Sequence, residues 1–450
     1  MSSTDNRRVV VTGYGMVTPL GRNAQETFDN ARLGVSGIRR ITSFDTSGLP
    51  TDIGGEIDPA WIAAITETLC EANIRYDGRI EKFVTRSDTL MLAATLEAIG
   101  MARLQLQQPQ RIGVSLGNHG QNPTVEDMMF LHRFYDGKGN WDVRALERTG
   151  GYPFFNFFKR KPDVASALIA AAFKFSGPNL SVASACAAGA QAIGEAVCLI
   201  REGRARVMIA GGAESCLDYT GFVGFVLIKA LAQKYTSPQK ASRPFDRRRS
   251  GFVMSEGAGA IVLEDLEHAT SRNATIYGEI LGYGSSADAY RITDTHPKGD
   301  GAILAMWAAL KDANLIVPGT TSEAIANETI AKDSIDYINA HGTSTVQNDL
   351  TETVAIKQVF GDMAKDIPVS SNKSMLGHTI AAAGAIEAIL SIMGINASLL
   401  LPTINYEHPD PKCDLDYVPN EARPKQHKRV LSNSFGFGGQ NACLCIGKFE

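Results

Sequence analysis

Two segments rich in Ala, Gly and Ile constrain the fold of this chain more than any other feature. Residues 187–200 and 379–393 are apolar on nearly every side of a helix, with small side chains gathered at their starts. A helix that is apolar all round belongs in the interior, where it packs on two sides. Small side chains also let the backbones of neighbouring sheets approach closely. The pattern therefore predicts two central helices buried between two β-sheets.

Short runs of apolar and β-branched residues supply the strands for these sheets. They form two series, 8–12, 111–115, 180–184, 207–211 and 260–263, followed by 276–283, 335–339, 367–371, 429–432 and 442–446. The runs lack polar alternation, which is typical of strands covered by helices on both faces. We therefore expect an α/β protein of five layers with halves at 1–268 and 269–450, although the halves share no obvious sequence repeat.

Composition excludes several classes of protein. The 450 residues include 44 basic and 48 acidic side chains, a net charge of −4 that disfavours nucleic acid as a partner. The first residues are not followed by the apolar core of a signal peptide, and no uninterrupted apolar run has the length of a membrane span. The seven cysteines are scattered and lack paired metal-ligand spacing. We expect a cytoplasmic protein with free thiols and no structural metal.

Three side chains stand where a predicted strand gives way to a loop or a helix: Cys186, His341 and His378. Sites in open α/β sheets form at such strand ends. One thiol and two imidazoles can support acyl transfer through a thioester. Cys186 also begins a predicted buried helix, where the helix dipole would lower the pKa of a thiol. The alternative is a core cysteine and two hydrogen-bonded histidines.

Charged residues near these positions are expected to support the structure. Glu387 is the only charged residue in its apolar segment, and a buried carboxylate needs a cationic partner. Lys373, on the turn that leads into this segment, is the candidate for that ion pair. A further helix is predicted over 350–360, with Asp349 as its N-cap and Glu352 three positions on.

The stretch 118–161 has no clear periodicity and is dense in aromatic residues. One interpretation is a long surface excursion whose aromatics pack locally or across a subunit interface. The other is a lining for an apolar substrate tunnel, since long loops in compact domains are usually functional.

Taken together, four motifs resemble those of the β-ketoacyl-[acyl-carrier-protein] synthases, the condensing enzymes of bacterial type II fatty acid synthesis. The motifs lie at 184–190, 339–345, 373–378 and 433–439, and the likeness extends over almost the whole chain. The resemblance implies a thiolase-like fold of two similar halves, usually in a homodimer. It also implies a decarboxylative Claisen condensation between an acyl thioester and malonyl-acyl-carrier protein, with acyl carrier protein as the partner and no cofactor.

The resemblance assigns roles to the residues already singled out. Cys186 would carry the acyl chain as a thioester, while His341 and His378 would act on the malonyl group and stabilise its enolate. Lys373 and Glu387 would support the site.

Four further positions follow from the same resemblance. Phe437, with Phe435 in the same glycine-rich loop, would gate the acyl pocket and share an oxyanion hole with the backbone of Cys186. Asp349 and Glu352 match acidic positions behind the histidine loop.

The chain departs from the family pattern at its substrate-facing segments. Residues 117–122 replace a glycine- and serine-rich turn, and the segment that follows is longer than usual. Acyl-pocket candidates here are Gly120, Phe154 and Phe155, and we expect medium or long acyl chains. The departures leave open a ketosynthase of a polyketide or polyene pathway with the same chemistry.

Other functions are disfavoured by single residues. A thiolase would need a second catalytic cysteine near the C-terminal glycine-rich loop, whereas Cys443 and Cys445 fall in the following strand. A non-catalytic chain-length factor typically lacks the nucleophile that this chain keeps. An acidic carrier protein would meet basic residues, for which the candidates are Lys229, residues 247–249 and, less favoured, residues 159–161.

Overall fold

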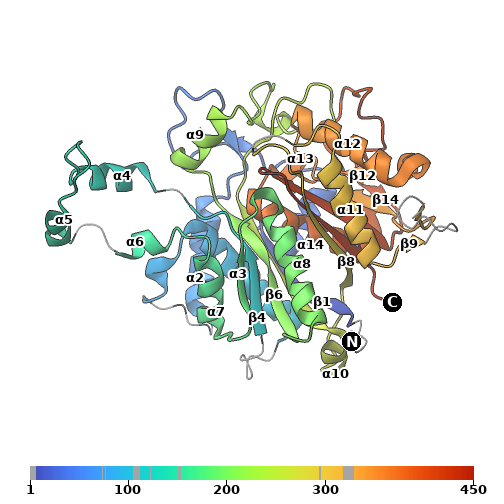
Figure 1. The fold of residues 1–450 in the computed structure, drawn as a ribbon, viewed down its shortest axis with the longest axis horizontal. Helices are drawn as coiled ribbons and strands as arrows, with labels where there is room; N and C mark the ends of the chain where they lie inside the picture. Colours follow the sequence, from blue (N-terminus) through green and yellow to red (C-terminus); the bar gives the residue numbers. More distant parts are fainter. Residues whose placement is uncertain are drawn as a thin grey trace.

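A ten-stranded mixed sheet organises the molecule (Figure 1). The computed structural model describes residues 7–72, 74, 76, 78–104, 112–121, 123–150, 154–292, 295–317 and 329–450. In spatial order the strands are β12 (Val369–Ser370), β11 (Tyr337–Asn339), β15 (Arg429–Gly436), β16 (Gln440–Gly447), β8 (Gly278–Ala287), β1 (Val9–Val17), β7 (Gly257–Asp265), β6 (Val207–Glu214), β4 (Ile112–Gly117) and β5 (Asn179–Val182). Each of the ten predicted runs overlaps one of these strands.

The two halves of the sheet repeat one topology. The first half holds β1, β4, β5, β6 and β7, and the second holds β8, β11, β12, β15 and β16. Numbered along the chain within each half, the strands lie in the order 3-2-4-5-1 in both. In both, strands 3, 2 and 4 pair in parallel, and strand 5 pairs antiparallel with 4 and 1. The fold therefore consists of two similar halves, although their sequences show no obvious repeat.

The halves are hydrogen-bonded to each other through their first strands. Val10 and Val11 of β1 pair antiparallel with Glu279 and Gly278 of β8. The sequence predicted two separate sheets, and this short pairing makes them continuous. It also removes two free edges, which would otherwise expose unpaired backbone groups.

The two predicted central helices are α8 (Ala188–Arg201) and α14 (Ala383–Ala397), and both lie in the largest apolar cluster. Small residues set their separation. A Cβ on Gly189 would lie 2.7 Å from the carbonyl oxygen of Ala381, and one on Gly384 would lie 2.8 Å from the Cβ of Ala190. The prediction of buried, closely packed central helices is confirmed.

Outer helices complete the layers. The first half is covered by α2 (Pro59–Glu71), α3 (Arg86–Ala102) and α7 (Val164–Phe173), and the second by α11 (Asp300–Asp312) and α12 (Val346–Phe360). Shorter elements are α1 (Ala24–Arg32), α9 (Tyr219–Leu227), α10 (Leu266–Ser271), α13 (Lys373–Leu376) and the strand pairs β2–β3 (Arg39–Arg40, Ile53–Gly54), β9–β10 (Ile316–Val317, Thr329–Ile330) and β13–β14 (Leu399–Leu400, Arg423–Pro424).

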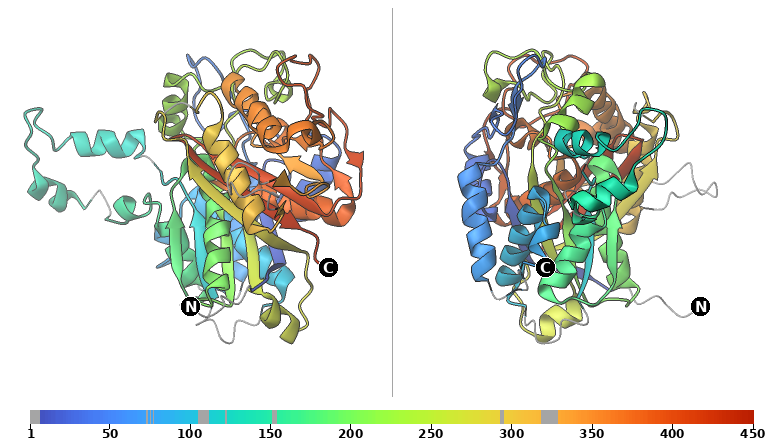
Figure 2. Two further views of the ribbon diagram at one scale, coloured as in Figure 1. Left: turned by 45° about the vertical axis from the view of Figure 1, so that its right-hand side comes forward. Right: turned by 90° about the vertical axis from the view of Figure 1, so that its left-hand side faces the viewer.

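The aromatic-rich segment forms an arm that projects from the body. It contains α4 (Val125–His132), α5 (Val143–Thr149) and α6 (Phe154–Phe158), and Figure 2 shows the first two standing clear of the sheet. Its aromatics pack locally, as in the contact of Tyr135 with Trp141 at 5.0 Å between ring centroids. Met129 and Trp141 remain exposed. The arm thus fits the interpretation of local or intersubunit packing.

One described helix has the length and composition of a membrane span. The window Ile380–Ala397 has 18 residues and a mean hydropathy of 1.7, and 89% of it is buried inside the molecule. It includes α14, so its apolar character belongs to the central layer.

Candidate active site

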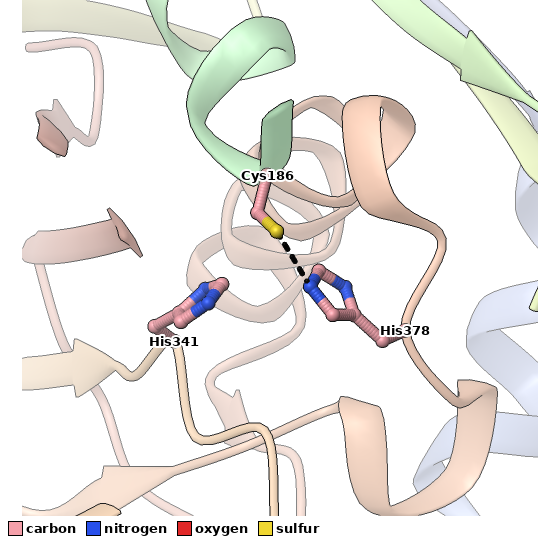
Figure 3. A group of neighbouring side chains, drawn as sticks. All are labelled: Cys186, His341 and His378. Carbon is pink, nitrogen blue, oxygen red and sulfur yellow. Dashed lines mark hydrogen bonds between the residues drawn. The ribbon is translucent and has the colours of Figure 1, made fainter. Parts of the chain in front are cut away.

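Cys186 lies at the start of the first central helix. After β5 the chain passes through Ala185, whose φ of +48° makes a tight turn into a short 3₁₀ helix, Ala185–Ala187, and then into α8. The side chain of Cys186 is 2% exposed. The turn aims the sulfur away from the sheet and toward two histidines that come from the other half of the chain (Figure 3).

His378 makes the direct contact with this sulfur. Its Nε2 lies 3.0 Å from Cys186 Sγ. The residue follows Gly377, which has a φ of +73°, and its backbone N–H donates to the carbonyl of Val253 at 2.7 Å. The rings of His378 and Phe252 form a T-shaped contact, with their centroids 5.2 Å apart. Backbone and ring are therefore both held, and the imidazole has little freedom to turn away.

His341 faces the same point from a loop that follows β11. Its ring lies 5.3 Å from that of His378, nearly perpendicular to it. The loop is fixed by Glu352, whose two carboxylate oxygens accept the backbone N–H groups of His341 and Gly342, each at 2.8 Å. Asn433 donates to the same carboxylate at 3.1 Å. Glu352 thus positions the histidine through its backbone.

The predicted ion pair between Lys373 and Glu387 is present. Lys373 Nζ contacts Glu387 Oε1, and both side chains are buried. The pair joins the turn before His378 to the helix after it. Since a buried charge is costly without its partner, the pair ties these two segments together.

Burial sets the protonation states of the three central side chains. Desolvation, assisted by the nearby charge of Lys373, holds the pKa of both histidines well below the usual range, so both rings are neutral near pH 7. Burial also raises the pKa of the Cys186 thiol to about 11, although the backbone N–H of Phe437 and the charge of Lys373 act against it. The expectation that the helix start lowers this pKa is wrong, because desolvation of a fully buried sulfur outweighs it.

Asp349 supports the histidine loop, but not as an N-cap. The helix α12 begins at Val346, one turn earlier than predicted, and Thr345 is the cap, accepting the N–H of Asn348 at 3.2 Å. Asp349 instead accepts the backbone N–H groups of Phe245 at 2.8 Å and Ser344 at 3.2 Å. The sequence pattern misplaced the cap because both residues are good N-cap formers four positions apart.

A cavity of about 350 Å³ opens onto the three side chains. Phe435 and Phe437 line it, as do Phe252 and Lys229. Phe435 is buried against His341 at 5.8 Å between centroids, whereas Phe437 is 37% exposed on the turn between β15 and β16. The two aromatics therefore have different environments, and Phe437 is the one placed to move at the entrance.

The acyl-pocket candidates do not line this cavity in the described structure. Gly120 lines a neighbouring cavity of about 430 Å³ and has a φ of +79°, so a side chain there would strain the backbone. Phe155 packs on Phe83 at 6.3 Å between centroids and is absent from the described lining of both cavities. The side chain of Phe154 lies outside the described part of the structure.

The same three residues also have the composition of a metal site. The sulfur and ring nitrogens of Cys186, His341 and His378 lie within 4.8 Å of one another. One thiol and two neutral imidazoles are a ligand set that zinc accepts. Geometry alone therefore allows either a metal site or a nucleophile with two polar partners.

Comparison with known proteins identifies the family of the chain. Residues 6–269 match the family model for the β-ketoacyl synthase N-terminal domain, and residues 317–407 match that for the C-terminal domain. The chain belongs to the β-ketoacyl synthase family. It is 39% identical to proteins named 3-oxoacyl-[acyl-carrier-protein] synthase 2 from Coxiella burnetii, over 99% of both chains, and from Synechocystis, over 100% of both.

Solved structures agree with this membership of the β-ketoacyl synthase family. The ishigamide ketosynthase/chain length factor superimposes with a TM-score of 0.83 at 31% identity, covering 99% of this chain and 100% of the other. The ketosynthase of a type II polyketide system, AntDE, solved with the acyl carrier protein AntF and a hexaketide, gives 0.80 at 31% over the same shares. The synthase family thus has the fold that the motifs implied.

Several residues of this synthase site were missed from the sequence. Phe252 packs on His378, and Phe225 packs on Phe252 at 5.5 Å between centroids. Asn433 bonds to Glu352 across the two segments. Asn433 lies in the motif 433–439, so the motif could have marked it, but the contacts depend on tertiary structure.

Proposed function

We propose that this protein is a β-ketoacyl-acyl-carrier-protein synthase that lengthens fatty acyl chains by decarboxylative Claisen condensation. The observation that carries the proposal is the contact of Cys186 Sγ with His378 Nε2 at 3.0 Å, beside His341, in a cavity at the start of a buried helix. The proteins named 3-oxoacyl-[acyl-carrier-protein] synthase 2 are 39% identical to this chain, whereas the ketosynthase of the type II polyketide system is 31% identical.

In the first step Cys186 takes the acyl group. Its thiol proton passes to the departing carrier sulfur as the Cys186 sulfur bonds to the thioester carbon, and His378 Nε2 lies 3.0 Å from the attacking sulfur. Backbone N–H groups of Cys186 and Phe437 point at the sulfur. Because the thioester carbon bonds to this sulfur, the same N–H groups lie where they can donate to the thioester oxygen, which carries the negative charge of the tetrahedral intermediate.

In the second step the two histidines act together. Both are neutral, and in the described structure the Nδ1 atoms have no hydrogen-bond partner, so a proton on Nε2 is the one that can be donated. The thioester oxygen of the malonyl group accepts from them while the carboxylate leaves as carbon dioxide. The resulting enolate carbon attacks the acyl carbon, and the Cys186 thiolate departs.

The test of this proposal is loading of the protein by a panel of acyl carrier proteins, followed by intact-protein mass spectrometry. A mass increase equal to the acyl group on wild type, absent from Cys186→Ala, is expected. Cys198→Ala, in the helix α8 that follows Cys186, is the matched control and should load normally. An adduct that persists in Cys186→Ala would reject the proposal.

The carrier protein is proposed to meet basic residues near the cavity entrance. Lys229 is exposed and lines the Cys186 cavity, and Arg247 and Arg248 are exposed and close in sequence to Ser250, which lines the same cavity. Arg249, also predicted from the sequence as a contact, is removed from this set of candidates because it is buried and donates to Asp410 at 2.7 Å.

The less favoured basic candidates lie on the segment that follows the arm. Arg160 pairs with Asp127 at 2.5 Å, and Lys161 lies over the ring of Phe157 at 4.6 Å. Lys159 is half-buried. Their local contacts make them poorer candidates than Lys229 for an acidic carrier protein.

A homodimer is proposed from the edges of the sheet. At one edge β12 is buried, and Val369 donates to the carbonyl of Asp416 at 2.7 Å. At the other edge Asn179 and Ser181 of β5 are exposed. An open edge strand is a template for pairing, so two copies could join through β5. Sedimentation at micromolar concentration should give a dimer, and a monomer would contradict the proposal.

The boundary between 1–268 and 269–450 also stays a proposal. It is supported by the start of β8 at Gly278, which opens the second 3-2-4-5-1 series.

A partner role as a chain-length factor is less favoured, because Cys186, His341 and His378 are all retained.

A further inference from the structure

The second cavity adjoins the Cys186 cavity and is larger, about 430 Å³ against about 350 Å³. Ile228 lines both. Phe225 lines the second cavity and packs against two rings that line the first, Phe252 at 5.5 Å and Phe437 at 6.3 Å. An acyl chain held on Cys186 that passes these aromatic rings would place its far end in the second cavity.

The wall of the second cavity carries hydrogen-bonding groups. His119, Gln121 and Cys216 line it. Behind Cys216 lies Glu214, which is buried and whose carboxylate accepts from the thiol at 3.0 Å and from the backbone N–H of Ser215 at 3.1 Å. Burial raises the pKa of Glu214, and the neighbouring His119 acts in the opposite direction, so these side chains influence each other.

A plain alkyl end would be poorly matched to this wall. His119 is exposed in the open cavity, where water can satisfy its ring nitrogens. An alkyl chain that displaced this water would leave the imidazole without a partner, and an unmatched polar group costs free energy. A hydroxyl or amide group at the same place would replace the lost water.

We propose that His119, with Cys216 and Glu214 behind it, makes this synthase select acyl chains that carry a neutral hydrogen-bonding group near the far end. The selection rests on the proposed condensing function and concerns only which chain Cys186 accepts. Apolar pockets commonly use a few polar groups in this way to discriminate between ligands.

The experiment is a competition for Cys186 between paired thioesters on acyl carrier protein. Each pair has a plain chain and an ω-hydroxy chain of equal length, from octanoyl to dodecanoyl, and intact-protein mass spectrometry measures the adducts. At the length that reaches the second cavity, wild type should load the hydroxylated chain about three- to tenfold faster.

Variants locate the effect. His119→Leu should remove the preference while loading of the plain chain survives, because Cys186 and the two catalytic histidines are untouched. His132→Leu, the same change on the exposed arm helix α4, is the matched control and should keep the preference. Cys216→Ala should strengthen the preference for the hydroxylated chain, because Glu214 loses its thiol donor and can accept a hydrogen bond from the substrate.

The outcomes are distinguishable. Equal loading of both chains by wild type at every length would overturn the selection, as would a preference that survives in His119→Leu. A protein that forms no adduct on Cys186 with any chain would instead overturn the proposed function, and the selection with it.

Discussion

The two halves of this molecule build the same turn at the start of their central helices and use it differently. In the first half, Ala185 has a φ of +48° and opens the 3₁₀ turn before α8. In the second half, Ile380 has a φ of +42° and opens the corresponding turn before α14. Each turn is followed four residues later by the glycine that contacts the other central helix, Gly189 or Gly384.

The functional side chains occupy different positions on these matching turns. Cys186, the proposed nucleophile, comes one residue after the left-handed position, and His378 comes two residues before its counterpart. After the second strand of each half the positions match instead, because His119 and His341 both stand two residues beyond the strand end. The repeated backbone brings the positions together, and the side chain at each decides whether it binds, donates or attacks.

The largest expected effect comes from removing the nucleophile. Cys186→Ala should lower condensation by about 10³-fold or more. Moving the thiol to the matching turn, in Cys186→Ala with Ala381→Cys, should not restore it, because Ala381 is fully buried and is absent from the described cavity lining. Measured turnover decides this, with circular dichroism as the control for folding. Restored activity would mean that the two turns are interchangeable.

Next in size is the buried ion pair of Lys373 and Glu387, beside the central helix of the second half. Lys373→Met should lower the free energy of unfolding by about 3–5 kcal/mol, because Glu387 is left buried without a cation. Lys373→Met with Glu387→Met should recover much of the loss. Urea denaturation measures both, and additive losses in the double variant would show that the pair does not act as a unit.

The histidines at matching strand ends should differ in effect. His341→Ala should lower malonyl decarboxylation by about 100-fold, since an oxyanion donor is lost, while loading of Cys186 survives. His119→Ala should leave decarboxylation unchanged, because it lines the other cavity. Carbon dioxide release, measured apart from thioester formation, tests the contrast. Equal losses in both variants would remove the enolate role of His341.

Buried carboxylates of the two halves should respond to pH in opposite senses. Glu264 contacts Arg272 and His268, and although burial opposes them these contacts lower its pKa to about 2, so its stabilisation is present above pH ~4.5 and is lost as pH falls toward 2. Burial raises the pKa of Glu352 to about 7, so it favours folding at low pH and this contribution is lost as pH rises toward 7.

Glutamine variants should show these opposite slopes. Glu264→Gln should flatten the acid side of a plot of unfolding free energy against pH, and Glu352→Gln should flatten the decline between pH ~4.5 and 7, each by about 3 kcal/mol. Chemical denaturation across this range measures both. Slopes that match wild type would contradict the assignment.

The smallest effect is expected at the cavity entrance. Lys229→Glu should slow turnover with an acidic carrier protein by about two- to tenfold at low salt, and the difference should shrink as ionic strength rises, since exposed charges mainly speed encounter. A loss that is independent of salt would indicate a packing role for Lys229 in the cavity wall.

The sequence by itself determined most of the layered fold and singled out the three residues of the proposed site. Strands covered on both faces and helices apolar all round have local patterns that can be read without tertiary structure, as residues 187–200 and 379–393 illustrate. The partner of Glu387 could also be predicted, because a buried charge demands one and Lys373 is near in sequence. The functional class came from motifs, which carry more information than periodicity.

Tertiary structure decided what depends on distance across the chain and on burial. The pKa of Cys186 follows its desolvation, which no local pattern reports, and this outweighs the helix start. Arg249 and Arg248 are neighbours in sequence, yet one is buried against Asp410 and the other is exposed. His119 and Glu214 come near enough to interact only because β4 and β6 pair in parallel and end at the same edge of the sheet.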